Sequence, residues 1–272
     1  MISACSGAHA PVYSTIMNSF KRRISERQIL GGTWCNLGST VTAEIAGLSG
    51  FDWVLIDLEH GSGTLTSLTP QLQAVGCTSA EAIVRIAANE PARYKRVLDM
   101  GARGVMVPYV NDADEAAQAV ASLRYPPAGF RGVAKSHRAT RYGSEFESYF
   151  STSADSLVLA TQIETADALE NADAIAAVDG VDVLFVGPLD LSTNLGIQAE
   201  YDHPKFEAAL SRVSDAAANA GKASGILLSE PDDVRRVAKI GYTFLAVGSD
   251  IGHVVAGMKK NSALIEEIRS KS

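Results

Sequence analysis

Acidic, amide, imidazole and guanidinium side chains recur near the ends of short apolar runs in this sequence, at Glu59, His60, Arg85, Gln162, Glu164 and Asp190. Paired carboxylates can hold a divalent cation, a histidine can exchange a proton near neutral pH, and an arginine supplies a fixed positive charge. These groups can act together only if the chain brings several strand ends to one place. A (β/α)8 barrel does so, because the C-terminal ends of its strands surround one mouth. The set therefore predicts an enzyme with that architecture.

Short apolar runs alternate with helix-like stretches along most of the chain. The predicted strands are 32–37, 52–58, 82–86, 104–110, 157–163, 183–186, 223–228 and 244–247. The predicted helices are 19–28, 40–48, 91–100, 112–123, 166–178, 205–220 and 231–240. Because strand and helix alternate without a break in composition, we predict an α/β fold: one (β/α)8 TIM barrel over residues 18–272, after a loose N-terminal leader at residues 1–17.

Bulk properties exclude some classes of partner. The 272 residues carry a net charge of −7, which argues against a nucleic-acid or anionic-membrane partner, since either requires a basic face. Three cysteines without metal-ligand spacing indicate reduced thiols. No apolar stretch reaches the roughly 20 residues that span a bilayer, and residues 1–15 lack the features of a secretory signal. A cytoplasmic protein with no membrane or nucleic-acid partner is expected.

His60 and Arg85 each allow two interpretations. His60 follows Asp57-Leu58-Glu59 at a strand end, where it is either an acid–base group or a local hydrogen-bonding residue. Arg85 lies in the apolar run 83–86, where an unpaired charge would be costly. It is either half of a structural salt bridge or a planar donor to a substrate carboxylate or developing oxyanion. Its place near the end of the strand favours the second interpretation.

Gln162, Glu164 and Asp190 form a candidate cation site. Gln162 and Glu164 are two residues apart and so share one face of their strand. Asp190 follows the next strand, which brings it within reach of Glu164. Either acid alone could be a helix N-cap, but together these hard oxygen ligands suit Mg²⁺ or Mn²⁺.

Two further segments attract attention. Residues 125–155 are unusually long for a connection and contain a basic cluster at 131–141. They are interpreted either as a cationic flap over the barrel mouth or a contact with a neighbouring subunit, or as a solvated loop with ordinary surface charges. Gly248-Ser249-Asp250 precedes a helix, and it is interpreted as a tight turn capped by Asp250 rather than as a phosphate site, because the aspartate would repel phosphate.

Several motifs in register carry a family resemblance between residues 18 and 255. They are Asn18-Ser19-Phe20-Lys21, Gly32-Thr33-Trp34, Phe51-Asp52-Trp53, Ile56-Asp57-Leu58-Glu59-His60, the run from Tyr125 to Val133, Gln162-Ile163-Glu164, and the run from Phe185 to Ser192. The sequence resembles the class II, metal-dependent pyruvate aldolases, the family of 4-hydroxy-2-oxoheptanedioate and 2-dehydro-3-deoxyglucarate aldolases. That resemblance implies a barrel of the phosphoenolpyruvate/pyruvate type with an N-terminal helix. It also implies a last helix swapped onto a neighbouring subunit, in dimers and commonly hexamers.

The resemblance also implies roles for individual residues. Glu164 and Asp190 would bind a divalent cation (Mg²⁺, Mn²⁺ or Co²⁺), with Gln162 beside them. Arg85 would contact the pyruvyl oxygens, and His60 would be the acid–base residue. The further implied residues are Asp57 or Asp99 as the orienting partner of His60, and Trp34, Leu189 and Leu227 as pocket-lining residues. Two departures from the family pattern, at Leu189 and at Lys135-Ser136-His137, are expected to alter the aldehyde pocket.

The expected reaction is reversible retro-aldol cleavage of a 4-hydroxy-2-oxo acid to pyruvate and an aldehyde, through a pyruvate enolate stabilised by the metal. No lysine stands at the predicted strand ends, and a metal-dependent aldolase requires none. One alternative is an acyl-CoA lyase or a decarboxylating C–C bond-forming enzyme with the same enolate chemistry. A CoA lyase would need a further basic groove, for which residues 131–141 are the candidate. The other alternative is a non-catalytic barrel that binds a 2-oxo acid or serves as an assembly subunit.

Overall fold

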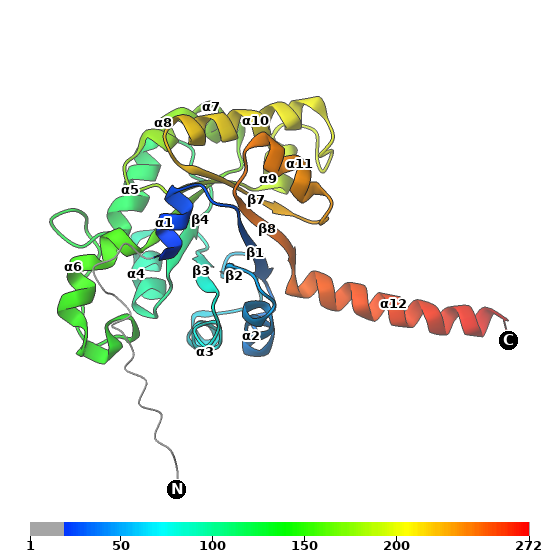
Figure 1. Ribbon diagram of the computed structural model, residues 1–272, viewed down its shortest axis with the longest axis horizontal. Helices are drawn as coiled ribbons and strands as arrows, with labels where there is room; N and C mark the ends of the chain where they lie inside the picture. Colours follow the sequence, from blue (N-terminus) through cyan, green and yellow to red (C-terminus); the bar gives the residue numbers. More distant parts are fainter. Residues whose placement is uncertain (1–18, 272) are drawn as a thin grey trace, which may run out of the picture.

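Parallel strands β1 to β8 close into a barrel in the order of the sequence (Figure 1). The computed structural model describes residues 19–271, so the predicted leader at residues 1–17 lies outside the described residues. The strands are β1 (Leu30–Cys35), β2 (Trp53–Asp57), β3 (Glu81–Arg85), β4 (Gly104–Val107), β5 (Val158–Ile163), β6 (Val183–Val186), β7 (Ala223–Leu228) and β8 (Phe244–Ser249). Because β1 pairs with both β2 and β8, the sheet has no free edge. The predicted (β/α)8 barrel is confirmed.

Helices connect the strands and cover the outside of the barrel, apart from the first, which closes one end, and the last, which extends away. They are α1 (Ser19–Ser25), α2 (Thr40–Leu48), α3 (Leu65–Val75), α4 (Pro91–Asp99), α5 (Ala113–Leu123), the 3-10 segment η1 (Arg138–Gly143), α6 (Phe146–Ser156), α7 (Ala166–Glu170), α8 (Ala172–Ala177), α9 (Pro188–Asn194), α10 (Pro204–Asn219), α11 (Asp233–Ile240) and α12 (Asp250–Lys271). The sequence did not predict α3, whose interior contains Pro70. The single helix predicted at 166–178 is two helices, because Asn171 ends α7 and begins α8.

Strand alternation separates two hydrophobic layers and sets the direction of the polar residues. In β2, Trp53 and Leu55 belong to the cluster inside the barrel, whereas Val54 and Ile56 pack against the outer helices. The next inward position is Asp57. The same alternation in β3 and β5 turns Arg85 and Gln162 inward at the C-terminal ends of their strands. Each of these polar residues follows the last inward-facing apolar residue of its strand by two positions. Their side chains therefore lie together at the barrel mouth.

Helix α1 closes the opposite end of the barrel. Phe20 and Ile24 are buried and belong to the interior cluster with Trp53 and Phe244. Burial of two such side chains removes apolar surface from water and contributes about 1.5–3 kcal/mol each. The predicted N-terminal helix is thus a plug, and it separates the two ends of the barrel.

Residues 125–155 lie at the plugged end, so the hypothesis of a flap over the mouth is wrong for this chain. The segment follows α5, which has already brought the chain back from the C-terminal ends of the strands to their N-terminal ends. Arg131 is no surface charge either: it is 2% exposed, donates to Asp99 at 2.7 Å and stacks over Tyr125 at 4.6 Å. The expected effect of residues 135–137 on an aldehyde pocket has no support within one chain, for the same topological reason.

Helix α12 extends away from the barrel (Figure 1). It has no buried residue, although it carries several large apolar side chains, namely Ile251, Val254, Val255, Met258, Leu264, Ile265 and Ile268. Within residues 19–271, no helix combines the length and the apolar character needed to cross a bilayer. The apolar side of α12 is largely exposed to solvent in the single chain.

Candidate active site

Arg85 is fixed at the barrel mouth by a two-point ion pair. Its Nε and Nη2 donate to the two carboxylate oxygens of Asp57, at 2.9 and 2.7 Å. Burial opposes ionisation of Asp57, but the hydrogen bonds and charge of Arg85 outweigh it, so the pKa of this carboxyl lies below its usual value. Asn36, at the end of β1, donates to Asp57 Oδ2 at 2.8 Å. This support leaves the planar guanidinium little rotational freedom.

Glu59 and His60 lie on the other side of the guanidinium group. Arg85 Nη1 is 3.0 Å from Glu59 Oε2, and His60 Nε2 is 3.8 Å from Glu59 Oε1. Burial raises the pKa of Glu59, although the charge of Arg85 opposes the shift. The His60 side chain is 67% exposed, so its ring can reach a molecule entering the mouth. The arrangement places a proton-exchanging ring beside a buried acid.

The orienting partners predicted for His60 do not contact its ring within this chain. Asp57 contacts His60 through the backbone alone, since its Oδ1 accepts the backbone N–H of His60 at 3.3 Å. Asp99 ends α4 at the plugged end of the barrel, where it pairs with Arg131 and lies 3.7 Å from His137. The carboxylate beside the His60 ring is that of Glu59. Because of strand alternation, Asp57 and Glu59 point to the same side. The sequence alone therefore does not show that Arg85 binds both oxygens of Asp57 but only one oxygen of Glu59.

Glu164 is buried directly after β5. Its Oε1 accepts the backbone N–H of Tyr109 at 2.8 Å, and its Oε2 accepts Nε2 of Gln162 at 2.9 Å. Burial raises the pKa of Glu164 to about 7, and the negative charges of Glu59 and Asp190 add to the shift. The negative charges of these neighbouring acids outweigh the nearby positive charge, which is a typical environment for a cation ligand.

Two details around Glu164 indicate a ligand that the protein itself does not supply. Gln162 is 2% exposed, and its Oε1 is buried without a hydrogen-bond partner. Such an atom is costly unless something binds it. Gly187 packs against the same carboxylate, since a Cβ at position 187 would stand 2.5 Å from Glu164 Oε2. The glycine therefore keeps the space beside Glu164 open.

Asp190 comes to the same place from the next element. It lies in the first turn of α9, and its charge raises the pKa of Glu59, Glu164 and Tyr109. The three carboxylates thus lie within electrostatic range of one another, with Arg85 already committed to two acids. Within residues 19–271 no group of three or more His, Cys, Asp or Glu forms a complete metal site. Two carboxylates and an unpaired amide oxygen fit a divalent ion whose remaining ligands are water or substrate.

The apolar residues implied by the family resemblance surround this centre at different depths. Trp34 is 2% exposed and lies under Arg85, with 5.3 Å between the guanidinium carbon and the ring centroid. Leu227 is half-buried and packs on the interior cluster. Leu189 begins the α9 turn and is 51% exposed. Trp34 therefore forms a fixed floor, whereas Leu189 stands at the open rim.

Sequence reasoning missed Tyr109 and Asn36. Tyr109 follows β4 in the left-handed region, with φ at 52°, and uses its backbone N–H for Glu164 and its hydroxyl for Asp190. No sequence pattern indicates a left-handed tyrosine. Asn36 could have been found, because it is a polar residue at the C-terminal end of a predicted strand.

Comparison with known proteins identifies a family and several relatives of this chain. The sequence profile of the HpcH/HpaI aldolase/citrate lyase family matches residues 31–256. The 5-keto-4-deoxy-D-glucarate aldolase of Klebsiella pneumoniae is 43% identical over 235 residues, which cover 86% of this chain and 91% of that protein. The corresponding protein of Escherichia coli O139:H28 is 42% identical over the same share of each chain. A crystal structure of an HpcH/HpaI aldolase/citrate lyase family protein from Burkholderia cenocepacia is 36% identical, with a TM-score of 0.87 over 93% of this chain and 99% of that one.

Proposed function

The chain belongs to the HpcH/HpaI aldolase/citrate lyase family and is a carbon–carbon lyase, and from that premise we propose that it cleaves a 4-hydroxy-2-oxo acid to pyruvate and an aldehyde. The observation that carries the proposal is the position of Arg85, which Asp57 and Glu59 hold beside the Glu164 carboxylate. A planar cation fixed in this way suits the carboxylate and keto oxygens of a 2-oxo acid.

Arg85 would stabilise the charge that develops when the C3–C4 bond breaks. The electron pair of that bond passes into the 2-oxo group and gives an enolate, whose oxygen carries negative charge. Because the guanidinium group is already oriented by its two acids, little reorganisation accompanies the reaction. Trp34 beneath it limits the access of water from below.

His60 would exchange the proton of the reaction. Cleavage requires a base for the proton of the C4 hydroxyl group, and the enolate then takes up one proton at C3 to become pyruvate, so no net proton is gained or lost; addition runs through the same transfers in reverse. The exposed ring stands at the mouth, where the aldehyde end of the substrate would lie. Glu59, whose Oε1 lies 3.8 Å from His60 Nε2, would help to hold the direction of the ring.

Glu164, Asp190 and the amide oxygen of Gln162 would hold a divalent cation. Such a cation, Mg²⁺, Mn²⁺ or Co²⁺, supplies Lewis-acid stabilisation of the enolate when bound. Tyr109 and Gln162 orient Glu164 through hydrogen bonds to both of its oxygens, which fixes the direction of the ligand lone pairs.

A substrate screen tests the proposal. Purified protein with Mg²⁺, Mn²⁺ or Co²⁺ is expected to release pyruvate from 5-keto-4-deoxy-D-glucarate and other 4-hydroxy-2-oxo acids, followed by a coupled lactate dehydrogenase assay. Acyl-CoA thioesters serve as the contrasting substrates. The basic segment 131–141 lies at the plugged end and provides no nucleotide groove at the mouth. Pyruvate from none of the oxo acids, or faster turnover of a thioester, would contradict the proposal.

We also propose that the enzyme works as a homo-oligomer in which α12 packs on a second copy. Its exposed apolar residues recur at helical spacing, and α2 exposes a matching stripe of Val41, Ile45 and Leu48. An apolar surface of this kind is typical of an interface. An isologous contact between two copies would cover both helices at once.

The pair of substitutions Ile265→Glu and Ile268→Glu is expected to convert the assembly to monomers, because it places two charges in the apolar stripe of α12. Sedimentation velocity measures the change. The matched control, Ala263→Glu with Ser270→Glu, adds the same charge to exposed positions on the other side of the same helix and is expected to leave the assembly intact. A monomeric wild-type protein, or an unchanged sedimentation coefficient in the apolar pair, would disprove this arrangement.

A further inference from the structure

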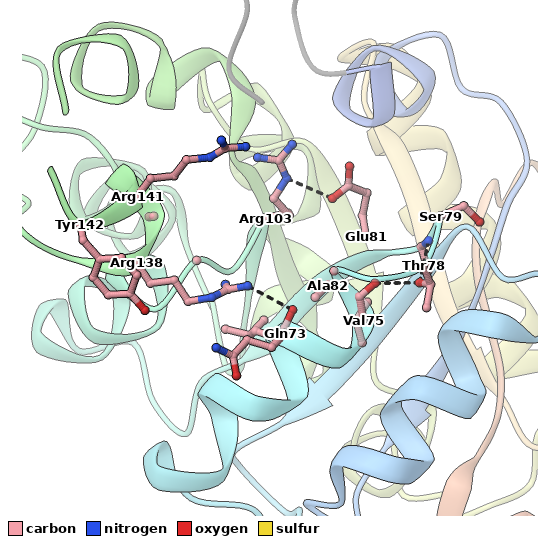
Figure 2. A pocket seen from close by; sticks show the side chains of 15 residues that line it. Gln73, Val75, Thr78, Ser79, Glu81, Ala82, Arg103, Arg138, Arg141 and Tyr142 are labelled. Atoms are coloured by element: carbon pink, nitrogen blue, oxygen red, sulfur yellow. Dashed lines mark hydrogen bonds and ion pairs between the residues drawn. The ribbon is translucent and has the colours of Figure 1, made fainter. Parts of the chain in front are cut away.

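A second cavity lies at the plugged end of the barrel, opposite the candidate active site. Its volume is about 560 Å³, and it is lined by the end of α3, the start of β3 and the segment η1 (Figure 2). The interior cluster, which includes Phe20 and Ile24 of α1, fills the barrel between its two ends. A cavity of this size can hold a metabolite-sized molecule. It is therefore a separate place in the molecule, with its own chemistry.

The cavity is positively charged in an acidic protein. Its lining includes Arg103, Arg138 and Arg141 against one acid, Glu81, and Glu145 pairs with Arg141 from outside the lining, which leaves a formal charge of +1 in a chain of net charge −7. Figure 2 shows the guanidinium groups of Arg103 and Arg141 turned toward each other, with that of Arg138 against the end of α3. Like charges that converge in this way repel one another unless an anion lies between them.

The arginines are held at the cavity by different means. Arg103 Nε is 3.0 Å from Glu81 Oε2, and Arg138 Nη1 donates to the carbonyl of Met100 at 2.9 Å. Arg141 is 45% exposed and pairs with Glu145 at 3.2 Å. Two guanidinium groups are thus anchored on neighbouring elements, while the third can close over a bound molecule. This is a suitable arrangement for an oxyanion, which accepts paired N–H donors from arginine.

The backbone of η1 is strained where it meets the cavity. Arg141 and Tyr142 are consecutive non-glycine residues in the left-handed region, with φ at 47° and 56°. Hydrogen bonds fix this turn: Tyr142 N–H donates to the carbonyl of His137 at 2.9 Å, and Gly143 N–H donates to Thr140 Oγ1 at 3.2 Å. Strained residues of this kind cluster at ligand clamps. The conformation directs the Arg141 and Tyr142 side chains to the rim of the cavity.

We propose that this cavity is a binding site for a small oxyanion metabolite, of the phosphate-ester or polycarboxylate class, distinct from the aldolase site. Arg103 and Arg138 form the fixed part of the site and Arg141 the closing part. The charge, the size and the strained turn each point to a ligand, and none of them serves the chemistry at the mouth.

Calorimetric titration of the full-length, metal-free protein tests the proposal, with inorganic phosphate, glucose 6-phosphate and citrate as probes and glucose as the neutral comparison. At least one anion is expected to bind saturably with one equivalent per chain, and glucose is not. Phosphate-containing probes and citrate are separate arms, so the preferred arm identifies the class of anion. The same titration with the Arg85→Lys variant, whose substitution lies at the mouth, is expected to give unchanged binding.

Arg141→Asn is expected to weaken the binding at least tenfold. Asparagine tolerates the left-handed conformation, so the turn is kept while the charge is lost. Arg212→Asn is the matched control, because Arg212 is 38% exposed and is likewise paired with one carboxylate, on α10 far along the chain. The melting temperature of each variant without probe shows that the fold is kept. Absence of saturable binding at millimolar probe, or equal affinity in Arg141→Asn and wild type, would overturn the proposal.

Discussion

Removal of divalent cations is expected to reduce pyruvate release to the background rate, and addition of Mg²⁺, Mn²⁺ or Co²⁺ is expected to restore it. The reason lies in the balance of charge at the mouth. Glu59, Glu164 and Asp190 are within electrostatic range of one another, and the one arginine among them is already paired with Asp57 and Glu59. Treatment with EDTA, desalting and a coupled pyruvate assay measure the effect. Full activity after thorough metal removal would refute the role of the metal.

The protonation of Glu164 gives this prediction a pH dependence of known sign. Without metal, the pKa of Glu164 is raised to about 7, so the group is largely protonated below that pH. Because a cation binds the carboxylate and must displace this proton, metal affinity is expected to fall as pH decreases below 7, by about tenfold per unit. Calorimetric titration with Mn²⁺ between pH 6 and pH 8 measures the slope.

Glu164→Gln tests whether the charge of Glu164 itself binds the metal ion. The amide keeps the size of the side chain but loses the charge, and metal affinity is expected to fall by more than the ~100-fold that loss of an outer partner can cost. Its pH dependence should disappear at the same time. The control is Glu170→Gln, at the exposed end of α7. Unchanged metal affinity in Glu164→Gln would remove this residue from the ligand set.

Arg85→Lys is expected to lower kcat by about 10²- to 10³-fold, which is the typical loss for one donor to a developing oxyanion. Lysine retains the charge but cannot donate to both oxygens of Asp57 and to Glu59 in one plane. KM is expected to change less than kcat, because the interaction strengthens as the enolate forms. Steady-state kinetics over a range of substrate concentration distinguish the two effects.

Arg85→Ala is expected to act on stability as well. It leaves Asp57 buried with no counter-charge, and loss of one partner of a buried pair typically costs about 3–5 kcal/mol. A decrease in melting temperature measures this loss of stability, and Arg212→Ala serves as the control for loss of an arginine elsewhere. A near-normal kcat in Arg85→Lys would assign Arg85 a purely structural role.

The fold and the centre of the site could be predicted because both follow from strand alternation. Asp57 lies two residues beyond Leu55, and Arg85 lies two beyond Ile83, so each continues an inward-facing row. Parallel strands then bring these rows to one mouth. The strand period accounts for Asp57 and Arg85, whereas Asp190 reaches the site from the first turn of α9.

The remaining features depend on backbone angles and on which end of the barrel a loop occupies. Tyr109 reaches Glu164 only because its φ is positive, and nothing in Val107-Pro108-Tyr109 indicates that angle. Arg131 reads as a surface charge in the sequence, yet two tyrosines and Asp99 enclose it. A one-dimensional pattern does not show such long-range packing.

The contrast between Gly187 and Leu189 has a practical consequence for enzyme engineering. Any side chain at position 187 would collide with Glu164, whereas Leu189 is half open to solvent only two residues away. A mutant library intended to accept new aldehydes should therefore randomise position 189 and leave 187 untouched. Under the proposed function, variants selected from it would keep the residues that hold the 2-oxo acid and differ in the aldehyde that they accept.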